Sequence, residues 1–244
     1  MLPELTTHDA LFLDLDGTLI EIAPTPSGVV IPKGLVRLLH RLAERLDGAV
    51  AILTGRSIED LDHLLVPFAP VAAGIHGAEF RSEPQGKIES RAGPIDAQVT
   101  LAVHDVADQN TGVLVEMKHA TIAVHFRQVP TLAPRIEAAL ARILEVGPDH
   151  LMLTRGRQVF EIVPRHVSKG AALDTIMRLP AFTGRRPIMI GDDAPDISAF
   201  EAAIRQGGKG LTVAGEQFPF AEADFPGPTE VRAWLAASAE GLTS

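Results

Sequence analysis

The sequence predicts an α/β fold in which a smaller α+β domain interrupts a domain built on a parallel sheet. Short apolar runs alternate with segments of helical periodicity in residues 1–89 and again in residues 167–244, and this alternation is typical of parallel strands joined by helices. Residues 90–166 instead read helix, strand, strand twice in succession, which is typical of an antiparallel sheet with helices. We therefore expect an outer domain from residues 1–89 and 167–244, with residues 90–166 inserted into it.

The first outer segment contains two predicted strands, each followed by an α-helix or its start. Residues 10–13 are apolar without alternation, as in a central strand buried on both faces. Pro32 begins a helix whose leucines recur every three or four residues, and residues 49–53 form a second buried strand. Ser57, with Asp60 three residues later, predicts the N-terminal cap of the next helix.

The inserted segment begins within a stretch that is rich in proline and glycine. Residues 82–94 contain prolines and glycines typical of a crossing between domains. The pattern that follows predicts two helices and four strands: helix 95–109, strands 113–117 and 121–126, helix 132–144, and strands 151–154 and 159–163.

The second outer segment returns to the first pattern. A helix begins near Ser168, residues 187–190 form a short buried strand, and residues 211–213 form the last strand. We expect Thr229 to cap the final helix.

Composition limits the function classes. With 244 residues and 46% hydrophobic content, the chain can bury the core of one domain or two modest ones. The net charge of −9 argues against a nucleic-acid partner, and the absence of cysteine excludes disulfides and thiol nucleophiles. The first residues resemble neither a signal peptide nor a membrane span, so we expect a cytoplasmic protein with no membrane partner. The sequence does not indicate the oligomeric state.

Acidic residues follow the first predicted strand. Asp14 and Asp16 stand at its carboxyl end, which is the edge where open α/β sheets bind ligands. Two carboxylates in one small volume repel each other unless a cation or a proton lies between them. A hard metal ion with acid–base chemistry explains the pair, and an ordinary acidic turn is the alternative.

Three further strand ends and helix starts carry related groups. Thr54 follows the second strand, Lys169 stands at a helix start, and a cluster of acids follows the strand at 187–190. Carboxylates for magnesium, a hydroxyl for a phosphate oxygen and a lysine for charge neutralisation are the groups that phosphoryl transfer requires. The motifs of serine hydrolases, P-loop proteins and zinc peptidases are absent from the sequence. The acids of the last cluster are Asp192, Asp193 and Asp196.

The segment Asp-Leu-Asp-Gly-Thr at 14–18 resembles the first signature of the haloacid dehalogenase superfamily of aspartyl-phosphate phosphatases. The other signatures correspond to Thr54, Lys169 and the acids at 192, 193 and 196. The resemblance implies a Rossmann-like core, with Asp14 as nucleophile and Asp16 as the acid that protonates the leaving oxygen and then activates water. It also implies Mg²⁺ bound by Asp14, the Asp16 carbonyl and Asp192, with Asp193 or Asp196 orienting metal-bound water. Thr54 and Lys169 would hold the phosphate.

Four more segments resemble the trehalose-6-phosphate phosphatases within that superfamily: residues 74–79, 115–118, 123–127 and 161–164. The resemblance implies a cap domain that selects a small sugar phosphate, trehalose 6-phosphate. The implied substrate-binding residues are Gly55, Arg56, His76, Glu79, Glu116, Lys118, His125, Arg127 and Glu161. The chain departs from the family pattern at Pro195, at Ile197, where a glutamate is usual, and at Phe126, where a tyrosine is usual.

Other interpretations stay open at this point. The same fold can act on another sugar phosphate, such as sucrose phosphate or a glycosyl-phosphoglycerate, and a non-catalytic sugar-phosphate sensor belongs to a different class. Glu116 and Lys118 share a strand face and could form an ordinary surface pair. His76, between two glycines, could merely satisfy a turn carbonyl.

Overall fold

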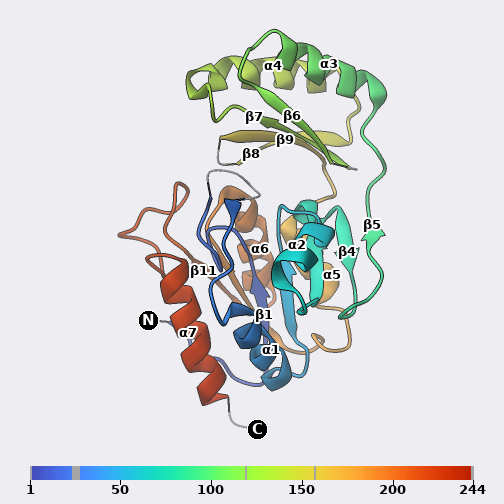
Figure 1. Ribbon diagram of the computed structural model, residues 1–244. Coiled ribbons are helices and arrows are strands. Elements are labelled where there is room, and N and C mark those ends of the chain that lie inside the picture. Colours follow the sequence, from blue (N-terminus) through green and yellow to red (C-terminus); the bar gives the residue numbers. More distant parts are fainter. Residues whose placement is uncertain (1, 24–27, 119, 157, 243–244) are drawn as a thin grey trace. The chain divides into compact units, whose positions relative to one another are not determined.

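The computed structural model describes residues 2–23, 28–118, 120–156 and 158–242, and the side chain of Lys118 lies outside this description. The chain divides into two compact units (Figure 1). We call Met1–Glu89 with Ser168–Ser244 the core unit, and Ser90–Val167 the inserted unit. Within the described residues, the structure contains no helix of the length and apolar character that a membrane crossing requires.

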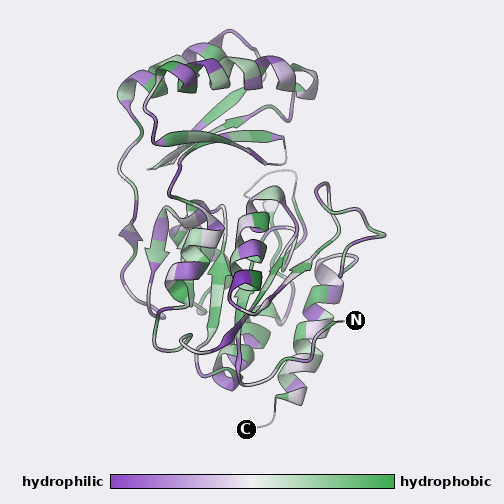
Figure 2. Cartoon of the chain, turned by 180° about the vertical axis from the view of Figure 1, so that it is seen from behind, coloured by the Kyte–Doolittle hydropathy of each residue, from purple (hydrophilic) through white to green (hydrophobic). Residues whose placement is uncertain are grey.

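A seven-stranded sheet forms the centre of the core unit. Its order is β11 (Lys209–Thr212), β10 (Arg186–Gly191), β1 (Asp9–Leu13), β2 (Val50–Leu53), β3 (Val71–Gly74), β4 (Glu79–Arg81) and β5 (Glu89–Ser90). The first five strands in this order pair in parallel, as in the predicted sheet, although β3 was not among the predicted strands, and β4 pairs antiparallel with β3. Strands β4 and β5 are too short for alternation to be recognised, so the sequence predicts neither of them. Figure 2 shows the central strands in the green of hydrophobic residues, as expected for strands covered on both faces.

Five α-helices surround this sheet (Figure 1): α1 (Leu35–Arg45), α2 (Ile58–Leu65), α5 (Lys169–Ile176), α6 (Ala194–Arg205) and α7 (Pro228–Gly241). Helix α1 packs against α7, and α5 packs against α6. The predicted cap at Ser57 is confirmed, because its hydroxyl accepts the N–H of Asp60 at 3.1 Å.

The predicted cap at Thr229 is wrong. Gly227 is the N-cap residue of α7, and Pro228 occupies the first helical position, which its fixed φ favours. Thr229 therefore lies inside the first turn, where its hydroxyl accepts a hydrogen bond from Arg232 at 3.0 Å.

The inserted unit is an α+β unit with an antiparallel sheet. Its strand order is β6 (Leu114–Lys118), β7 (Thr121–His125), β9 (Val159–Pro164) and β8 (Leu151–Gly156). Helices α3 (Ala97–Asp108) and α4 (Ala133–Val146) cover one face of this sheet (Figure 1). The order of helices and strands is the predicted one.

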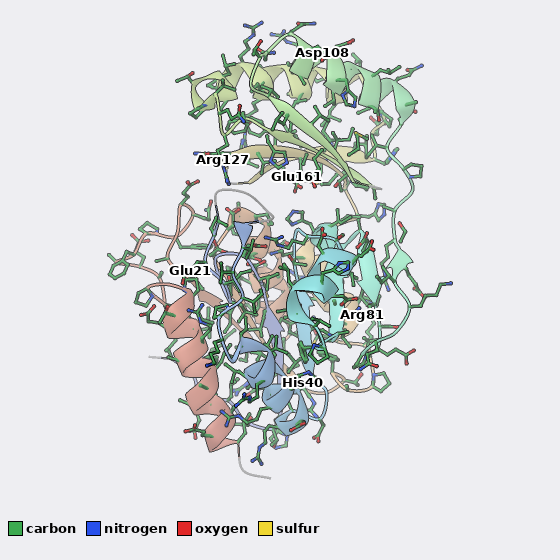
Figure 3. All side chains as sticks on the ribbon, in the orientation of Figure 1. Glu21, His40, Arg81, Asp108, Arg127 and Glu161 are labelled. Carbon is green, nitrogen blue, oxygen red and sulfur yellow. The ribbon has the colours of Figure 1, made fainter. Side chains whose placement is uncertain are left out.

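The strand register places Glu116 and Glu161, the two glutamates predicted to bind substrate in the inserted unit, in one row across the sheet. Glu116 pairs with Ala123, Ala123 with Glu161, and Glu161 with Thr154. The neighbouring row, which includes Val124 and Phe160, packs in the hydrophobic cluster with the helices. Since side chains alternate along a strand, Glu116 and Glu161 lie on the face away from α3 and α4, as Figure 3 shows for Glu161.

Candidate active site

The carboxyl ends of β1 and β10 bring Asp14 beside the acids that follow β10. The N–H of Asp14 donates to the carbonyl of Ile190 at 3.0 Å, which extends the pairing of β1 with β10 by one residue. This register is set by two apolar strands with no polar side chain between Ala10 and Leu13. The acids therefore meet at one end of a rigid, buried part of the sheet.

Lys169 connects two of these carboxylates. Its Nζ lies 2.6 Å from Oδ1 of Asp14 and 2.6 Å from Oδ1 of Asp196, and all three side chains are buried. Burial alone would lower the pKa of Lys169, but the two carboxylates more than offset it, so its pKa is raised. Lys169 is the first residue of α5, fixed by the capping hydroxyl of Ser168. The lysine is therefore charged and held against the end of β1.

The turn from β10 into α6 fixes the remaining acids. Asp193 is the N-cap of α6, and Oδ2 of Asp196 accepts the N–H groups of Asp192 and Asp193, each at 3.1 Å. Pro195 falls in the first helical turn, where a missing N–H costs no helical hydrogen bond. The departure from the family pattern at Pro195 is therefore compatible with this turn. Ile197 lies exposed one residue after Asp196.

The turn after β1 contacts Asp192 directly. Gly17 adopts a φ of 87°, and a Cβ at this position would lie 2.1 Å from Oδ2 of Asp192. The hydroxyl of Thr18 donates to Oδ1 of Asp192 at 3.2 Å. Thr18 is not among the residues predicted for the site, although its place in the Asp-Leu-Asp-Gly-Thr segment was the available signal.

Three buried carboxylates converge beside Lys169. One oxygen from each of Asp14, Asp192 and Asp196 lies within 4.8 Å of the others. Burial raises the pKa of Asp14 to about 7, and burial with the charges of Asp14 and Asp196 raises the pKa of Asp192 to about 9. Lys169 offsets part of the negative charge, and a bound divalent cation would offset the rest. The oxygen donors fit a hard metal ion.

Asp16 faces a different partner. Nε of Arg56 lies 2.6 Å from its Oδ2, and the Nη2 of Arg56 lies 2.6 Å from its Oδ1. This two-point ion pair raises the pKa of Arg56. Thr54, which is buried at the end of β2, accepts the backbone N–H of Arg56 on its hydroxyl at 3.1 Å.

The segment after β3 lies against this loop. The N–H of His76 donates to the carbonyl of Thr54 at 3.0 Å, and the N–H of Ile75 donates to the carbonyl of Arg56 at 2.8 Å. Oε2 of Glu79 accepts the N–H of Ile58, the first residue of α2, at 2.7 Å. A carboxylate at this position complements the positive end of the helix.

The inserted unit carries the other predicted residues. Nε2 of His125 lies 2.8 Å from Oε2 of Glu116, a diagonal contact between β6 and β7 on the face away from the helices. Glu161 lies in the same row as Glu116. Arg127 is exposed in the turn after β7, where Figure 3 labels it.

Comparison with known proteins identifies the family. The family model described as trehalose-phosphatase matches residues 12–219. The chain belongs to the trehalose-phosphatase family. It is 37% identical over 235 residues to the trehalose-6-phosphate phosphatase of Escherichia coli strain K12, covering 96% of this chain and 87% of that protein.

Solved structures agree on the fold of this trehalose-phosphatase family member. The C-terminal domain of Candida albicans trehalose-6-phosphate phosphatase superposes with a TM-score of 0.79 at 19% identity, over 96% of this chain and 92% of that one. A haloacid dehalogenase-like hydrolase from Bacteroides thetaiotaomicron gives a TM-score of 0.69 at 17% identity, over 96% and 99%. The predicted family and the predicted fold class are confirmed.

The structure groups the predicted metal ligands only in part. Asp14, Asp192 and Asp196 form one cluster, whereas the side chain of Asp16 binds Arg56 and that of Asp193 caps α6. By the family resemblance, Asp16 would bind the metal through its backbone carbonyl, and this role does not depend on the direction of its side chain. The roles of these residues stay predictions.

Metal removal should make the stability of the folded chain fall as pH rises. Without metal, the pKa values of Asp14 and Asp192, about 7 and about 9, exceed the ordinary 3.8. The folded chain then binds more protons than the unfolded chain above about pH 4, so the free energy of unfolding decreases toward pH 9. Magnesium bound by these carboxylates would compete with those protons, so added magnesium should raise the melting temperature more at about pH 8 than at about pH 5.

Calorimetry of the chelated and the magnesium-loaded protein at both pH values measures this difference. Asp192→Asn is the matched variant, because it removes the carboxylate with the higher of the two pKa values and should reduce the pH dependence of the magnesium effect. An equal magnesium shift at both pH values in the unmodified protein would contradict a metal site at these carboxylates.

Proposed function

We propose that this chain is a magnesium-dependent phosphatase that hydrolyses trehalose 6-phosphate to trehalose and phosphate. The observation that carries the proposal is the contact of Asp14 with Lys169 at the end of β1, beside two further buried carboxylates, in a chain of the trehalose-phosphatase family. A buried nucleophile, a fixed cation and oxygen donors for a metal are the groups needed for transfer of a phosphoryl group. A cytoplasmic location and the lack of nucleic-acid and membrane partners stay predictions.

Asp14 is the nucleophile in this proposal. A carboxylate oxygen of Asp14 forms a bond to phosphorus as the bond from phosphorus to the sugar oxygen breaks, which gives an aspartyl phosphate. Asp16 gives a proton to the departing sugar oxygen and then takes one from the water that attacks the aspartyl phosphate. The products are the free sugar, inorganic phosphate and the original Asp14 carboxylate.

Thr54 and Lys169 hold the transferred group. The hydroxyl oxygen of Thr54 accepts the N–H of Arg56, so its hydrogen is directed elsewhere and can be donated to a phosphate oxygen. Lys169 supplies positive charge beside Asp14. Magnesium held by Asp14, the Asp16 carbonyl and Asp192 would neutralise charge on the phosphoryl oxygens. Asp193 and Asp196 keep Asp192 in place through the backbone of the α6 turn.

Selection of the sugar is assigned to the inserted unit. The core groups are sufficient for any phosphate monoester, so discrimination needs groups that bind sugar hydroxyls. Glu116, Lys118 and Glu161 are proposed for this task, and the register that puts Glu116 and Glu161 in one row supports a shared surface. The His125 ring restrains Glu116 through the 2.8 Å contact.

A panel of sugar phosphates tests the proposed substrate. Phosphate release from trehalose 6-phosphate should exceed that from sucrose phosphate and from a glycosyl-phosphoglycerate, measured as kcat/KM with magnesium present. A higher value for another ester would keep the phosphatase and change its substrate. No turnover of any phosphate ester would favour the sensor interpretation.

Truncation of the cap glutamates should affect one substrate and spare another. Glu116→Ala or Glu161→Ala should lower kcat/KM for trehalose 6-phosphate roughly tenfold or more, because an unpaired hydroxyl partner costs ~1–3 kcal/mol. Hydrolysis of p-nitrophenyl phosphate, which has no sugar, should barely change. Glu145→Ala, on the exposed surface of α4, is the control and should leave both rates unchanged. Equal losses on both substrates would refute the assignment.

A further inference from the structure

The contact between Arg56 and Asp16 points to a role for Arg56 other than substrate binding. We propose that Arg56 is a positioning residue that fixes the orientation of the Asp16 carboxylate, and that residues 74–79 hold Arg56 in place. The proposal rests on the proposed phosphatase function and concerns the proton-transfer step of that same site.

The guanidinium group of Arg56 binds both oxygens of the Asp16 carboxylate, and this two-point contact, here called the fork, determines which way the carboxylate faces. Two nitrogens of one planar guanidinium bind the two carboxylate oxygens, each at 2.6 Å. This geometry fixes the plane of the carboxylate as well as its position. A carboxylate offers about four lone pairs, so the fork leaves one on each oxygen for the transferred proton. Proton transfer depends steeply on such alignment.

The backbone of Arg56 is held on both sides. Its N–H donates to the hydroxyl of Thr54 at 3.1 Å, and its carbonyl accepts the N–H of Ile75 at 2.8 Å. The side chain of Asp16 is only half-buried, so packing alone would leave it some freedom. Because its backbone is fixed, Arg56 holds the side chain of Asp16 in one position that packing alone would not determine.

The segment that supports Arg56 is conformationally unfavourable by itself. Ile75 and His76 have φ values of 47° and 55°, in the left-handed region, and this region is a true outlier for a β-branched residue such as isoleucine. These conformations aim both N–H groups at the loop of Arg56, one at the Arg56 carbonyl and one at the Thr54 carbonyl. Strain kept at such a place indicates function.

Two more contacts join the same two loops. A Cβ on Gly55 would lie 2.7 Å from the Cε1 and Nε2 atoms of His76, so the imidazole covers the Gly55 backbone. Glu79 binds the N–H of Ile58 two residues after Arg56. Residues 74–79 thus support the loop that contains Arg56. His76 and Glu79 affect the reaction through that loop.

The test is the dependence of kcat/KM on the leaving group. We would measure a series of substituted phenyl phosphates for the unmodified protein, Arg56→Ala, Arg56→Lys, Asp16→Asn and the double variant Arg56→Ala with Asp16→Asn. The value of kcat/KM reports the step that expels the phenol, and only poor leaving groups need a proton from Asp16. Inhibition by inorganic phosphate is measured in parallel.

We expect Arg56→Ala to lower kcat/KM about 10²-fold for the poorest leaving groups and little for p-nitrophenyl phosphate. Arg56→Lys, which lacks the fork, should behave similarly but more mildly. In the Asp16→Asn background, Arg56→Ala should change the rate by no more than about twofold, because the two residues act as one unit. Phosphate inhibition should stay the same.

A matched control is available at the other end of β1. Arg186 binds Asp9 through Nε at 2.7 Å and Nη2 at 3.1 Å, in the same fork geometry. Arg186→Lys removes the same two-point contact far from the reacting groups. The dependence of kcat/KM on the leaving group should therefore not change in this variant. Gly55→Ala, which pushes the His76 ring away, should produce a weaker form of the Arg56→Ala pattern.

Direct phosphate binding by Arg56 would produce different results. A uniform loss across the phenyl series, weaker phosphate inhibition and multiplied losses in the double variant would overturn the proposal. An unchanged leaving-group dependence in Gly55→Ala would overturn the part assigned to residues 74–79. Phenyl phosphates contain no sugar, so hydrolysis of them without hydrolysis of trehalose 6-phosphate would refute the proposed substrate and leave this inference standing.

Discussion

Asp14→Asn should abolish turnover of every phosphate ester while the protein remains folded. An amide does not attack phosphorus and does not balance the charge of a metal ion, so we expect a loss of at least ~10⁴-fold. The fold should be retained in metal-free protein, because Lys169 keeps its 2.6 Å contact with Asp196. Burial also raises the pKa of Asp14 to about 7, so loss of its negative charge costs the folded state less than loss of an ordinary carboxylate would.

Phosphate release and thermal unfolding of Asp14→Asn measure both expectations. Asp108→Asn makes the same chemical change on the exposed surface of α3, and Figure 3 marks its position. It should alter neither activity nor melting temperature. Activity above background in a folded Asp14→Asn protein would refute the covalent mechanism.

Lys169→Met should destabilise the protein strongly as well as inactivate it. The lysine is buried between Asp14 and Asp196, with 2.6 Å to each. Removal of one partner of a buried ion pair typically costs ~3–5 kcal/mol, because the remaining charge is left uncompensated. The remaining carboxylates must then take up protons in the folded state, so the loss of stability should grow as pH rises from about 5 to about 8.

Chemical denaturation of Lys169→Met at both pH values gives the free energies of unfolding. Lys209→Met, at an exposed position of β11, is the matched control and should change stability little. If Lys169→Met were as stable as the unmodified protein at about pH 8, the lysine would not be compensating these carboxylates.

Periodic elements were predictable from the sequence, and irregular ones were not. The leucines of α1 recur at helical spacing, and the unbroken apolar run of β1 has the length and composition of a buried strand. Strand β4 has three residues and begins directly after a tight turn with left-handed conformations, so no period identified it. The start of α7 was misplaced because Thr229 suits a cap, whereas Pro228 moved the helix start to the preceding residue.

The sequence could predict which residues lie together at the site. It could not predict which side chains form hydrogen bonds or ion pairs with one another. Parallel strands end at one edge of a sheet, and this topology predicted that Asp14, Lys169 and Asp192 lie close together. The choice of partner depends on side-chain packing between segments far apart in the sequence. The Arg56 fork on Asp16, the two contacts of Lys169 and the capping role of Asp193 therefore appeared only in the structure.

The hydrogen bond from the His166 ring to the carbonyl of Arg91, at 3.3 Å, joins the two ends of the inserted unit. The two ends of the inserted unit therefore lie side by side, as the two ends of a short turn do. Another segment with adjacent ends could replace it without moving the strands of the core unit apart. If the inserted unit selects the sugar, as proposed, exchange of one contiguous stretch of the gene can change substrate preference and leave the residues of the core unit unchanged. A chimera that carries a foreign segment between residues 90 and 167 should retain its action on p-nitrophenyl phosphate.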